Sequence, residues 1–262
     1  MNILEEIAEK TRERVERARK VKSLEEIKRE AEALPSDTGF PFEKALAGEG
    51  VSFICEVKKA SPSKGLIAPE FPYVEIAQAY EKAGARAVSV LTEPYYFQGA
   101  DAYLAEISRN VSIPLLRKDF TVDAYMIYEA KLMGASAVLL ICSILSEREL
   151  AEYIKIAESL GLSALVEAHD EQEAAMAVRA GTRIIGVNNR DLKTFTVDIH
   201  NSIRLRKLIP EQILFVSESG IRGPEDIREL AENQVNGALV GETLMRAGNV
   251  KEVLAEMIAA GR

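Results

Sequence analysis

Acidic, basic and amide side chains recur at the ends of short apolar runs in this sequence. Glu56 and Lys58 lie two positions apart at the end of the run VSFICEVK, so both would project from one face of an extended strand. Four other runs end in a comparable group: Lys118, Glu167, Asn188 and Glu218. Ammonium and carboxylate groups that meet in one pocket can donate and accept protons, so this set predicts acid–base chemistry.

Ion pairs that only close the end of a sheet are the alternative interpretation of these residues. A charged group inside a buried strand is costly unless it is paired, and a single Lys–Glu pair would fit either interpretation. Two lysines, three glutamates and an asparagine on five different runs favour a functional site. His169 lies two positions after Glu167, but Asp170 can begin the next helix, so we interpret His169 as structural.

Eight apolar runs, rich in β-branched residues, alternate with amphipathic segments from residue 51 onward and must position these groups. The runs are almost continuously hydrophobic, as expected for parallel strands covered by helices. They span residues 51–58, 87–92, 113–118, 137–142, 163–168, 183–189, 213–219 and 237–242. Helix-ending glycines are expected between them at Gly84, Gly134, Gly161 and Gly181.

Eight βα units in series predict an α/β protein built as a (β/α)8 TIM barrel, with functional groups at the carboxyl ends of the strands. A doubly wound sheet is the alternative, but neither a GxGxxG nor a GxxxxGK[ST] phosphate loop is present. Residues 1–50 precede the first strand and predict a long amphipathic helix and a short helix over 41–48. We expect one domain, 1–262, in which residues 1–50 are an N-terminal helical extension packed on the barrel.

Glycines after the last two runs indicate a phosphate site. The segment SESGIRGPEDI places Gly220 in a turn, and VGETLM places Gly241 where the last strand passes into a helix. Barrels of this type often bind phosphate between these two loops, through backbone N–H groups that a side chain would obstruct. Turn chemistry alone explains either glycine, but the pair favours a phosphorylated substrate. The Glu242 side chain is expected to point away from the phosphate.

The connection KASPSKGLIAPEFP after the first run is longer than most βα loops. Its composition suits a mobile loop that covers a substrate, and a surface loop whose Lys64 faces water is equally compatible.

The composition of the 262-residue chain excludes several classes of protein. Its formal net charge of −8 argues against a nucleic-acid partner, and no apolar run approaches the roughly 20 residues of a membrane span. The acidic N-terminus has no signal-peptide core, and Cys55 and Cys142 within apolar runs predict reduced, buried thiols in a cytoplasmic protein. With only His169 and His200 besides the cysteines, the sequence predicts no metal-ligand cluster.

Six motifs in this order, each at the end of an apolar run, resemble those of the indole-3-glycerol phosphate synthase family. They are EVKKASPSKG, LLRKDF, VEAH, GVNNRDLKTF, SESGI and LVGETLM, and the resemblance covers essentially the whole chain. It implies conversion of 1-(2-carboxyphenylamino)-1-deoxyribulose 5-phosphate to indole-3-glycerol phosphate in tryptophan biosynthesis, with loss of carbon dioxide and water. It further implies a monomer that acts on a phosphorylated small molecule without a cofactor.

The resemblance also implies catalytic roles. Lys118 would be the general acid for ring closure, and Lys58 would hold the substrate carboxylate and supply or relay a proton for dehydration. Glu167 would act in the dehydration as acid or base. The supporting residues would be Glu56 and Glu218, which orient the lysines, and Asn188, which bonds to a substrate hydroxyl.

Binding residues follow from the same resemblance. The phosphate site would comprise Ser219, Gly220, Gly241 and the backbone N–H of Glu242. Ser61 and Arg190 would lie at the polar edge of the site, and the apolar wall for the anthranilate ring would comprise Phe97, Phe120, Leu139 and Leu192.

Three other functions compete with this one. A Schiff-base aldolase could use Lys118 as a nucleophile on a ketone. The isomerase of the preceding step is also a phosphate-binding barrel, but it needs one acid and one base and does not explain two lysines with three glutamates. A phosphate-binding or scaffold barrel without activity would bind the substrate but not turn it over.

Overall fold

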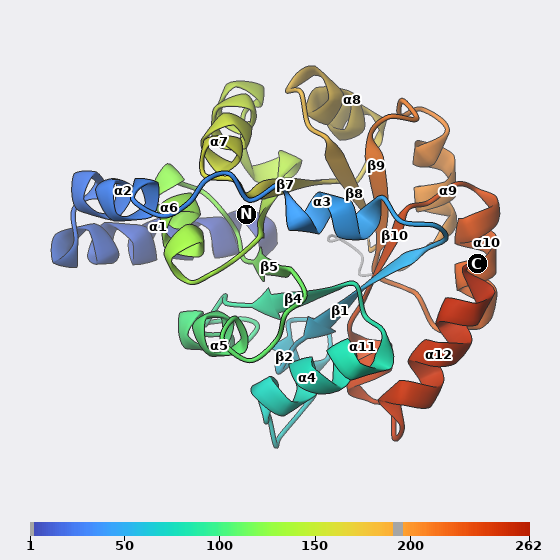
Figure 1. The fold of residues 1–262 in the computed structure, drawn as a ribbon. Coiled ribbons are helices and arrows are strands. Elements are labelled where there is room, and N and C mark those ends of the chain that lie inside the picture. The colour runs from blue at the N-terminus through green and yellow to red at the C-terminus, as the bar shows by residue number, and fades with distance from the viewer. Residues whose placement is uncertain (1–2, 191–195) are drawn as a thin grey trace.

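The computed structural model describes residues 3–190 and 196–262, and its eight parallel strands close into a barrel (Figure 1). Around the barrel the strands follow the order β1-β10-β9-β8-β7-β6-β5-β4, so strands consecutive along the chain are neighbours. Their bounds are β1 (Ser52–Val57), β4 (Ala87–Leu91), β5 (Leu115–Lys118), β6 (Ala137–Ile141), β7 (Ser163–Ala168), β8 (Ile184–Asn188), β9 (Leu214–Glu218) and β10 (Gly237–Val240). The predicted (β/α)8 barrel is confirmed.

Helices surround the barrel and connect its strands (Figure 1). They are α4 (Tyr73–Ala83), α5 (Asp101–Ile107), α6 (Ala124–Leu132), the short 3-10 helix η1 (Cys142–Ile144), α7 (Glu147–Ser159), α8 (Glu171–Arg179), α9 (His200–Arg206), α10 (Pro224–Glu232), α11 (Glu242–Met245) and α12 (Val250–Ala260). The four expected helix-ending glycines all have left-handed backbone, with φ from 73° at Gly161 to 101° at Gly84.

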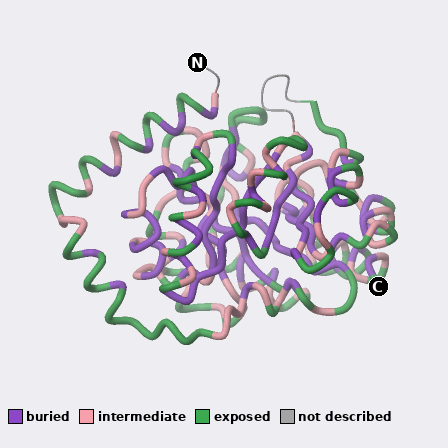
Figure 2. Tube along the Cα trace, turned by 90° about the horizontal axis from the view of Figure 1, so that it is seen from above, coloured by how far each residue is buried: buried purple, intermediate pink, exposed green. Residues whose placement is uncertain are grey.

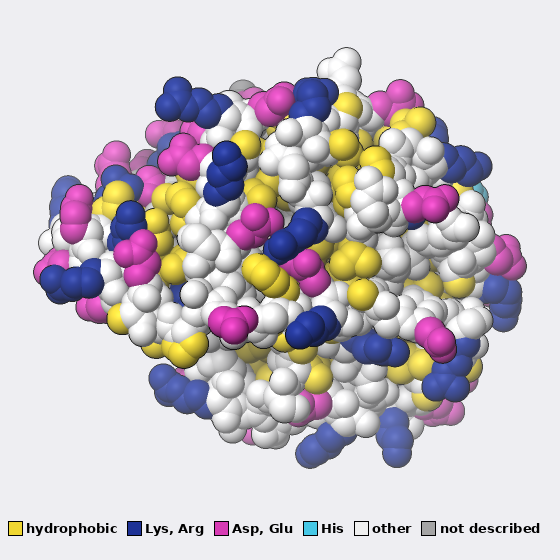
Figure 3. All heavy atoms as spheres, turned by 45° about the horizontal axis from the view of Figure 1, so that its top comes forward, with side chains coloured by type: hydrophobic (Ala, Val, Ile, Leu, Met, Phe, Trp, Pro, Cys, Tyr) yellow, Lys and Arg dark blue, Asp and Glu magenta, His cyan; other side chains and the backbone are white. Residues whose placement is uncertain are grey.

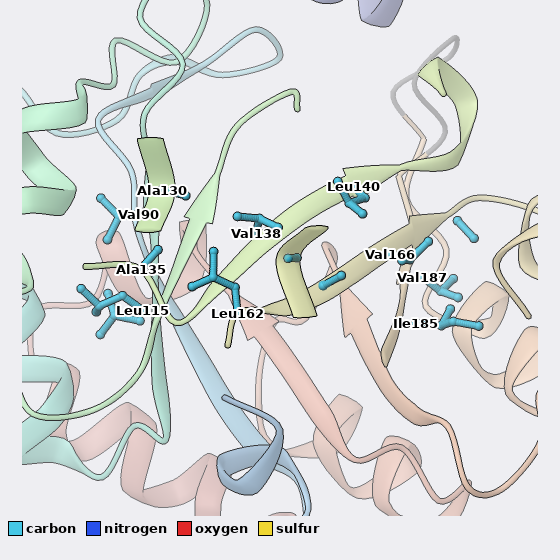
Figure 4. Packing of buried hydrophobic residues seen from close by; sticks show 14 of the residues in the cluster. Val90, Leu115, Ala130, Ala135, Val138, Leu140, Leu162, Val166, Ile185 and Val187 are labelled. Carbon is cyan, nitrogen blue, oxygen red and sulfur yellow. The ribbon is translucent and has the colours of Figure 1, made fainter. Parts of the chain in front are cut away.

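Side chains along each strand alternate between the lumen of the barrel and the layer under the helices. On β6, Val138 and Leu140 belong to the outer cluster, whereas Leu139 and Ile141 belong to the inner one. Figure 4 shows Val138 and Leu140 packed with other residues of the outer cluster. Because both faces of each strand are buried, the strands read as continuous apolar runs in the sequence.

Three helices precede β1, one more than sequence analysis predicts: α1 (Ile3–Val21), α2 (Leu24–Glu32) and α3 (Pro41–Leu46). The additional helix, α2, begins with a capping box in which the Glu26 N–H donates to Ser23 Oγ and the Ser23 N–H donates to Glu26 Oε2. The Ser-x-x-Glu spacing of that box is the sequence signal that identifies α2.

The helices before β1 contact both ends of the barrel. At the amino end of the strands, Ser163 Oγ of β7 donates to Glu43 Oε1 of α3 at 3.0 Å, and α3 crosses this end in Figure 1. At the carboxyl end, Arg14 Nη2 of α1 lies 2.7 Å from Asp119 Oδ2, directly after β5. Leu4 and Ile7 of α1 join the inner apolar cluster of the barrel. Helix α1 therefore lies at the end where functional groups were expected.

The loop after β1 contains a small hairpin, β2 (Ala60–Ser61) paired with β3 (Gly65–Leu66), which sequence analysis does not predict.

Burial is concentrated in the strands, whereas the helices expose their outer faces (Figure 2). On the face drawn in Figure 3, basic and acidic side chains are interspersed. Cys55 and Cys142 are buried free thiols, as predicted. Across residues 3–190 and 196–262, no helix is both long and apolar enough to cross a membrane.

Candidate active site

A cavity of about 630 Å³ opens at the carboxyl ends of the barrel strands. Every predicted site residue that the structure describes lines it: Glu56, Lys58, Ser61, Phe97, Lys118, Phe120, Leu139, Glu167, Asn188, Arg190, Glu218, Ser219, Gly220, Gly241 and Glu242. Leu192 lies outside the described residues. Residues from strands and loops throughout the sequence thus converge on a single space.

Two glycines leave room for the charged side chains in the lumen. A Cβ atom at Gly186 of β8 would overlap Glu218 Oε1, and one at Gly241 would overlap the Glu56 carboxylate and lie 3.0 Å from Lys58 Nζ. A glycine inside an apolar run often marks such a close approach. The run RIIGVNN carried that signal for Gly186, which sequence analysis did not use.

Lys118 lies between two carboxylates at the end of β5. Its Nζ is 3.3 Å from Glu167 Oε2 and 3.7 Å from Glu218 Oε2. Burial alone would lower the pKa of Lys118, but the attraction of Glu167, Glu218 and Glu56 outweighs burial and raises it above its usual value. Lys118 is therefore an ammonium group that can donate a proton inside the cavity.

Glu167 of β7 is held by three groups. Its Oε2 accepts from Lys118, its Oε1 accepts from Asn188 Nδ2 at 3.2 Å, and the same Oε1 lies 3.3 Å from His169 Nε2. Burial would raise the pKa of Glu167, but Lys118, His169 and Asn188 outweigh it and lower the pKa well below its usual range. Glu167 is therefore ionised, which is the form that accepts a proton.

Glu218 of β9 has the opposite electrostatic environment. Burial raises its pKa, and the nearby Glu167 and Glu56 carboxylates add to this effect, so the pKa of Glu218 reaches about 8 in spite of Lys118. Its Oε1 has no hydrogen-bond partner among the described residues. Carboxylates whose pKa values are driven apart around a shared ammonium are typical of acid–base sites.

Lys58 and Glu56 form a second charged pair at the end of β1. Lys58 Nζ lies 2.6 Å from Glu56 Oε2, and both side chains are mostly buried. The two-residue spacing thus places both groups on the lumen face, as predicted. Charge-assisted contacts of this length fix the ammonium in one orientation.

The glycine loops after β9 and β10 meet at one edge of the cavity. Ser219 and Gly220 both have left-handed backbone, with φ of 66° and 82°. A Cβ atom at Gly220 would overlap Val197, so this turn requires glycine. Thr243 Oγ1 of α11 donates to the Ile221 carbonyl at 2.6 Å and joins the two loops.

Glu242 lies between two cations at this edge. Its Oε1 is 3.5 Å from Lys64 Nζ and 3.2 Å from Arg246 Nε. The acidic charge beside the glycine loops is therefore compensated within the protein. Lys64, whose role sequence analysis left open, lines the cavity from the β2–β3 hairpin loop.

The apolar wall comes from the loops after β4 and β5 and from the lumen. The rings of Phe97 and Phe120 are 6.2 Å apart, and Leu139 of β6 is almost fully buried beside the cavity. Buried Glu93 accepts the Phe97 backbone N–H at 3.0 Å and so fixes the loop that presents Phe97. Ile3, Leu4 and Ile7 of α1 also line the cavity, a contribution that sequence analysis missed.

His169 begins the connection to α8 but also contacts the cavity's charged cluster. Asp170 caps α8 as expected, with Oδ1 accepting from the Gln172 and Glu173 N–H groups. In addition, the His169 ring lies between Glu167 and Glu173, with Nδ1 2.9 Å from Glu173 Oε2. The structural interpretation of His169 is therefore incomplete.

Comparisons with known proteins agree with the geometry. The family model described as indole-3-glycerol phosphate synthase matches residues 4–257. An indole-3-glycerol phosphate synthase of Ruminiclostridium cellulolyticum is 57% identical over 97% of this chain and 98% of its own length. The enzyme of that name from Endomicrobium trichonymphae is 53% identical over 97% and 99%.

Solved structures with little sequence similarity share the fold. The 3-hexulose-6-phosphate synthase of Salmonella typhimurium superposes with a TM-score of 0.67 at 12% identity, covering 80% of this chain and 98% of that one. This likeness supports the barrel architecture alone.

Proposed function

Because the chain belongs to the indole-3-glycerol phosphate synthase family, we propose that its cavity performs the family's reaction by general acid–base catalysis with the residues described above. The protein converts 1-(2-carboxyphenylamino)-1-deoxyribulose 5-phosphate to indole-3-glycerol phosphate, releasing carbon dioxide and water. The observation that carries the proposed mechanism is the Lys118 ammonium, which lines the cavity between Glu167 and Glu218.

In ring closure, Lys118 donates its proton to the ketone oxygen of the substrate. At the same time the ring carbon that bears the carboxylate attacks the ketone carbon, so a carbon–carbon bond forms and the ketone becomes a hydroxyl. Departure of carbon dioxide then returns the electrons of the carbon–carboxylate bond to the ring and restores its aromaticity. The whole reaction consumes one proton, and the raised pKa of Lys118 keeps that proton available at neutral pH.

In dehydration, the new hydroxyl leaves as water and the adjacent carbon loses a proton. The ionised Glu167 is suited to accept that proton, because Lys118, His169 and Asn188 keep its pKa low. Lys58 supplies or relays the proton to the departing hydroxyl, and Glu56 holds Lys58 in place. Of the two roles that sequence analysis left open for Glu167, the electrostatics favour the base.

Binding of the substrate uses the remaining cavity residues. The turn at Ser219 and Gly220, together with Gly241 and the Glu242 N–H, is suited to hold the phosphate, and Lys64 and Arg246 add positive charge at that edge. The anthranilate ring packs on the wall of Phe97, Phe120 and Leu139. Ser61 and Arg190 bond to polar groups of the substrate. We further propose a cytoplasmic monomer, since one chain supplies the cavity and its two thiols are free.

The test of this mechanism is the growth of indole fluorescence when the purified protein is mixed with the substrate. Wild-type protein should form indole-3-glycerol phosphate, and Lys118→Ala should lose roughly 10³-fold in kcat/KM, the scale of a general acid. Borohydride added during turnover should trap no adduct, because an ammonium group is not a nucleophile. A trapped adduct at Lys118 would support the Schiff-base alternative, and an active Lys118→Ala would refute the proposed acid.

A further inference from the structure

We infer that His169 is a positioning residue for the reaction: its imidazolium holds Glu167 as an oriented carboxylate until the dehydration step. The inference deepens the proposed function, since it rests on Glu167 being the base. His169 itself does not line the cavity, whereas Glu167 does. Any effect of His169 on the substrate must therefore pass through Glu167.

The contacts of the ring identify its protonation state. Nδ1 lies 2.9 Å from Glu173 Oε2 and Nε2 lies 3.3 Å from Glu167 Oε1, so each ring nitrogen faces a carboxylate. In a neutral imidazole one nitrogen would carry a lone pair and repel the oxygen that it faces. In the doubly protonated ring both nitrogens carry a proton toward a carboxylate: Nδ1 forms a hydrogen bond with Glu173, and Nε2 contacts Glu167 as an ion pair. Both carboxylates accordingly raise the pKa of His169, to about 10, against the effect of burial.

The imidazole ring of His169 is held by a residue of the surrounding helices and not by a residue of the barrel lumen. Glu173 lies in the first turn of α8 and accepts both the His169 N–H at 2.8 Å and the ring Nδ1. The His169 carbonyl accepts from Asn201 Nδ2 of α9 at 3.1 Å. Helix α8 thus holds the imidazole ring and α9 holds the backbone carbonyl of His169 at the end of β7, which places the ring beside Glu167.

The groups around Glu167 explain why a second cation is useful. Lys118 of β5 and His169 supply positive charge, Asn188 of β8 donates a hydrogen bond, and Glu218 of β9 is the nearby carboxyl group. The carboxylates in contact with His169 are Glu167 and Glu173, Glu218 also interacts electrostatically with His169, and the Cys142 thiol lies 3.6 Å from the Glu173 carbonyl. Burial raises the pKa of the Cys142 thiol, which stays neutral.

Proton donation by Lys118 removes one of these cations. After ring closure Lys118 is a neutral amine, and its attraction for Glu167 is lost before Glu167 has acted as base. His169 is then the cation that keeps Glu167 ionised. Its Nε2 is buried, has no hydrogen-bond acceptor among the described residues, and lies 3.3 Å from Glu167 Oε1, so its proton faces that carboxylate.

Imidazole NMR tests the protonation state directly, because the chain has only two histidines, His169 and His200. In wild-type protein both ring nitrogens of His169 should carry protons at about pH 8, above the ordinary pKa of histidine. In Glu167→Gln the pKa of His169 should fall by about one unit, because one of its two carboxylates becomes neutral. A neutral His169 ring at pH 7 in the wild-type protein would overturn the inference.

Kinetics test the effect on Glu167. His169→Asn should lower kcat about tenfold and leave KM within about twofold, and the acidic limb of its pH–rate profile should move up by about one unit. Glu173→Gln removes the negative charge at Nδ1, so the pKa of His169, read by NMR, should fall by about one unit. Glu171→Gln is the matched control, since the exposed Glu171 on the same helix pairs with Arg204 and should change neither value.

The outcomes separate this inference from the proposed function. A folded His169→Asn with wild-type kcat and an unshifted pH profile would refute the role of His169 and leave the role of Lys118 intact. A uniform loss of kcat without a pH shift would likewise refute it, because a purely structural residue gives that result. Should His169→Asn fail to fold, Glu173→Gln and the wild-type NMR measurement still decide the question.

Discussion

Arg117 and Lys118 are consecutive cations on β5, but they leave opposite faces of the strand into different environments. Arg117 points to the layer under the helices, where its guanidinium bonds to Asp101, Glu129, Thr92 and the Met126 carbonyl. Lys118 points into the lumen, where it contacts Glu167 and Glu218 at 3.3 and 3.7 Å and faces the cavity.

The two cations differ in how many of their N–H groups have a hydrogen-bond or ion-pair partner at short distance. Each N–H-bearing nitrogen of Arg117 has a partner within 3.3 Å, and the residue is 1% exposed. Lys118 has longer contacts, and neighbouring Glu218 keeps an oxygen without a partner among the described residues. A saturated buried network stabilises one structure, whereas unsatisfied groups facing a cavity are available to a substrate. We therefore propose that the outer face of β5 contributes stability and that its lumen face contributes catalysis.

The largest effect is expected on the lumen face. Lys118→Met should lower kcat/KM by roughly 10³-fold, because the variant has no proton to donate to the ketone. The free energy of unfolding should change by less than about 2 kcal/mol, because Glu218 has a pKa of about 8 and stays neutral, and His169 still faces Glu167. Steady-state indole fluorescence and urea unfolding measure the two quantities, and an activity loss below tenfold would contradict the assignment.

The matched change on the outer face should reverse this pattern. Arg117→Met leaves Asp101, Glu129 and Asp119 without their shared cation and should lower the free energy of unfolding by about 3 kcal/mol. Its kcat/KM per folded molecule should stay within about tenfold of wild type. Denaturant unfolding with activity measured below the transition tests this, and unchanged stability would show that the network is dispensable.

A methyl group in the lumen should disturb catalysis more than folding. Gly186→Ala places a Cβ where Glu218 Oε1 lies, and the flexible end of that side chain can move aside. We expect kcat/KM to fall about tenfold as Glu218 is displaced from Lys118, with a stability change of less than about 1 kcal/mol. Gly181→Ala is the control for this prediction. A Cβ atom at Gly181 would contact no other residue, but the backbone there has a positive φ, so this variant should lose stability and keep its activity.

The raised pKa of Glu218 predicts a pH-dependent stability. Between its unfolded pKa and about 8, the folded protein binds this proton more tightly than the unfolded chain, so Glu218 costs stability as the pH rises through that window. The stability of Glu218→Gln relative to wild type should therefore rise by about 3–4 kcal/mol between roughly pH 5 and pH 8. Unfolding curves at both pH values give the difference, and a constant difference would disprove the shifted pKa.

The smallest effect is expected at the phosphate edge. Lys64→Ala should raise KM severalfold and leave kcat unchanged, because an exposed lysine contributes only about 1 kcal/mol to binding. Glu242→Gln frees Lys64 from its ion pair and should lower KM slightly. Initial rates at several substrate concentrations measure both, and a change confined to kcat in either variant would place Lys64 in the chemical steps instead.

The sequence was most informative where strand periodicity and residue chemistry act together. The period of two placed Glu56 with Lys58 on the lumen face, and the strand ends carried Lys118, Glu167, Asn188 and Glu218 to one cavity. Parallel strands fix that convergence, since their carboxyl ends meet at one end of the barrel. The roles of these residues are proposals that rest on the family resemblance and the geometry.

The sequence pattern does not predict contacts between elements that are distant from each other in the chain. The apolar face of α1 predicts packing, but not that Ile3, Leu4 and Ile7 reach the cavity. The sequence pattern indicates only that His169 precedes a helix. It does not predict the ring contacts of His169, because these depend on where α8 places Glu173. Helix α2, in contrast, has a local signal, because Ser23 and Glu26 form its capping box.

The most direct test of the central claim, that the two faces of β5 carry separate functions, is the double variant Arg117→Met/Lys118→Met. Its activity per folded molecule and its free energy of unfolding are compared with those of wild type and of both single variants. We predict that the double variant has the activity of Lys118→Met and the stability of Arg117→Met, within about 1 kcal/mol of additivity. If Arg117→Met alone removed as much activity per folded molecule as Lys118→Met, the separation of the two faces would be refuted.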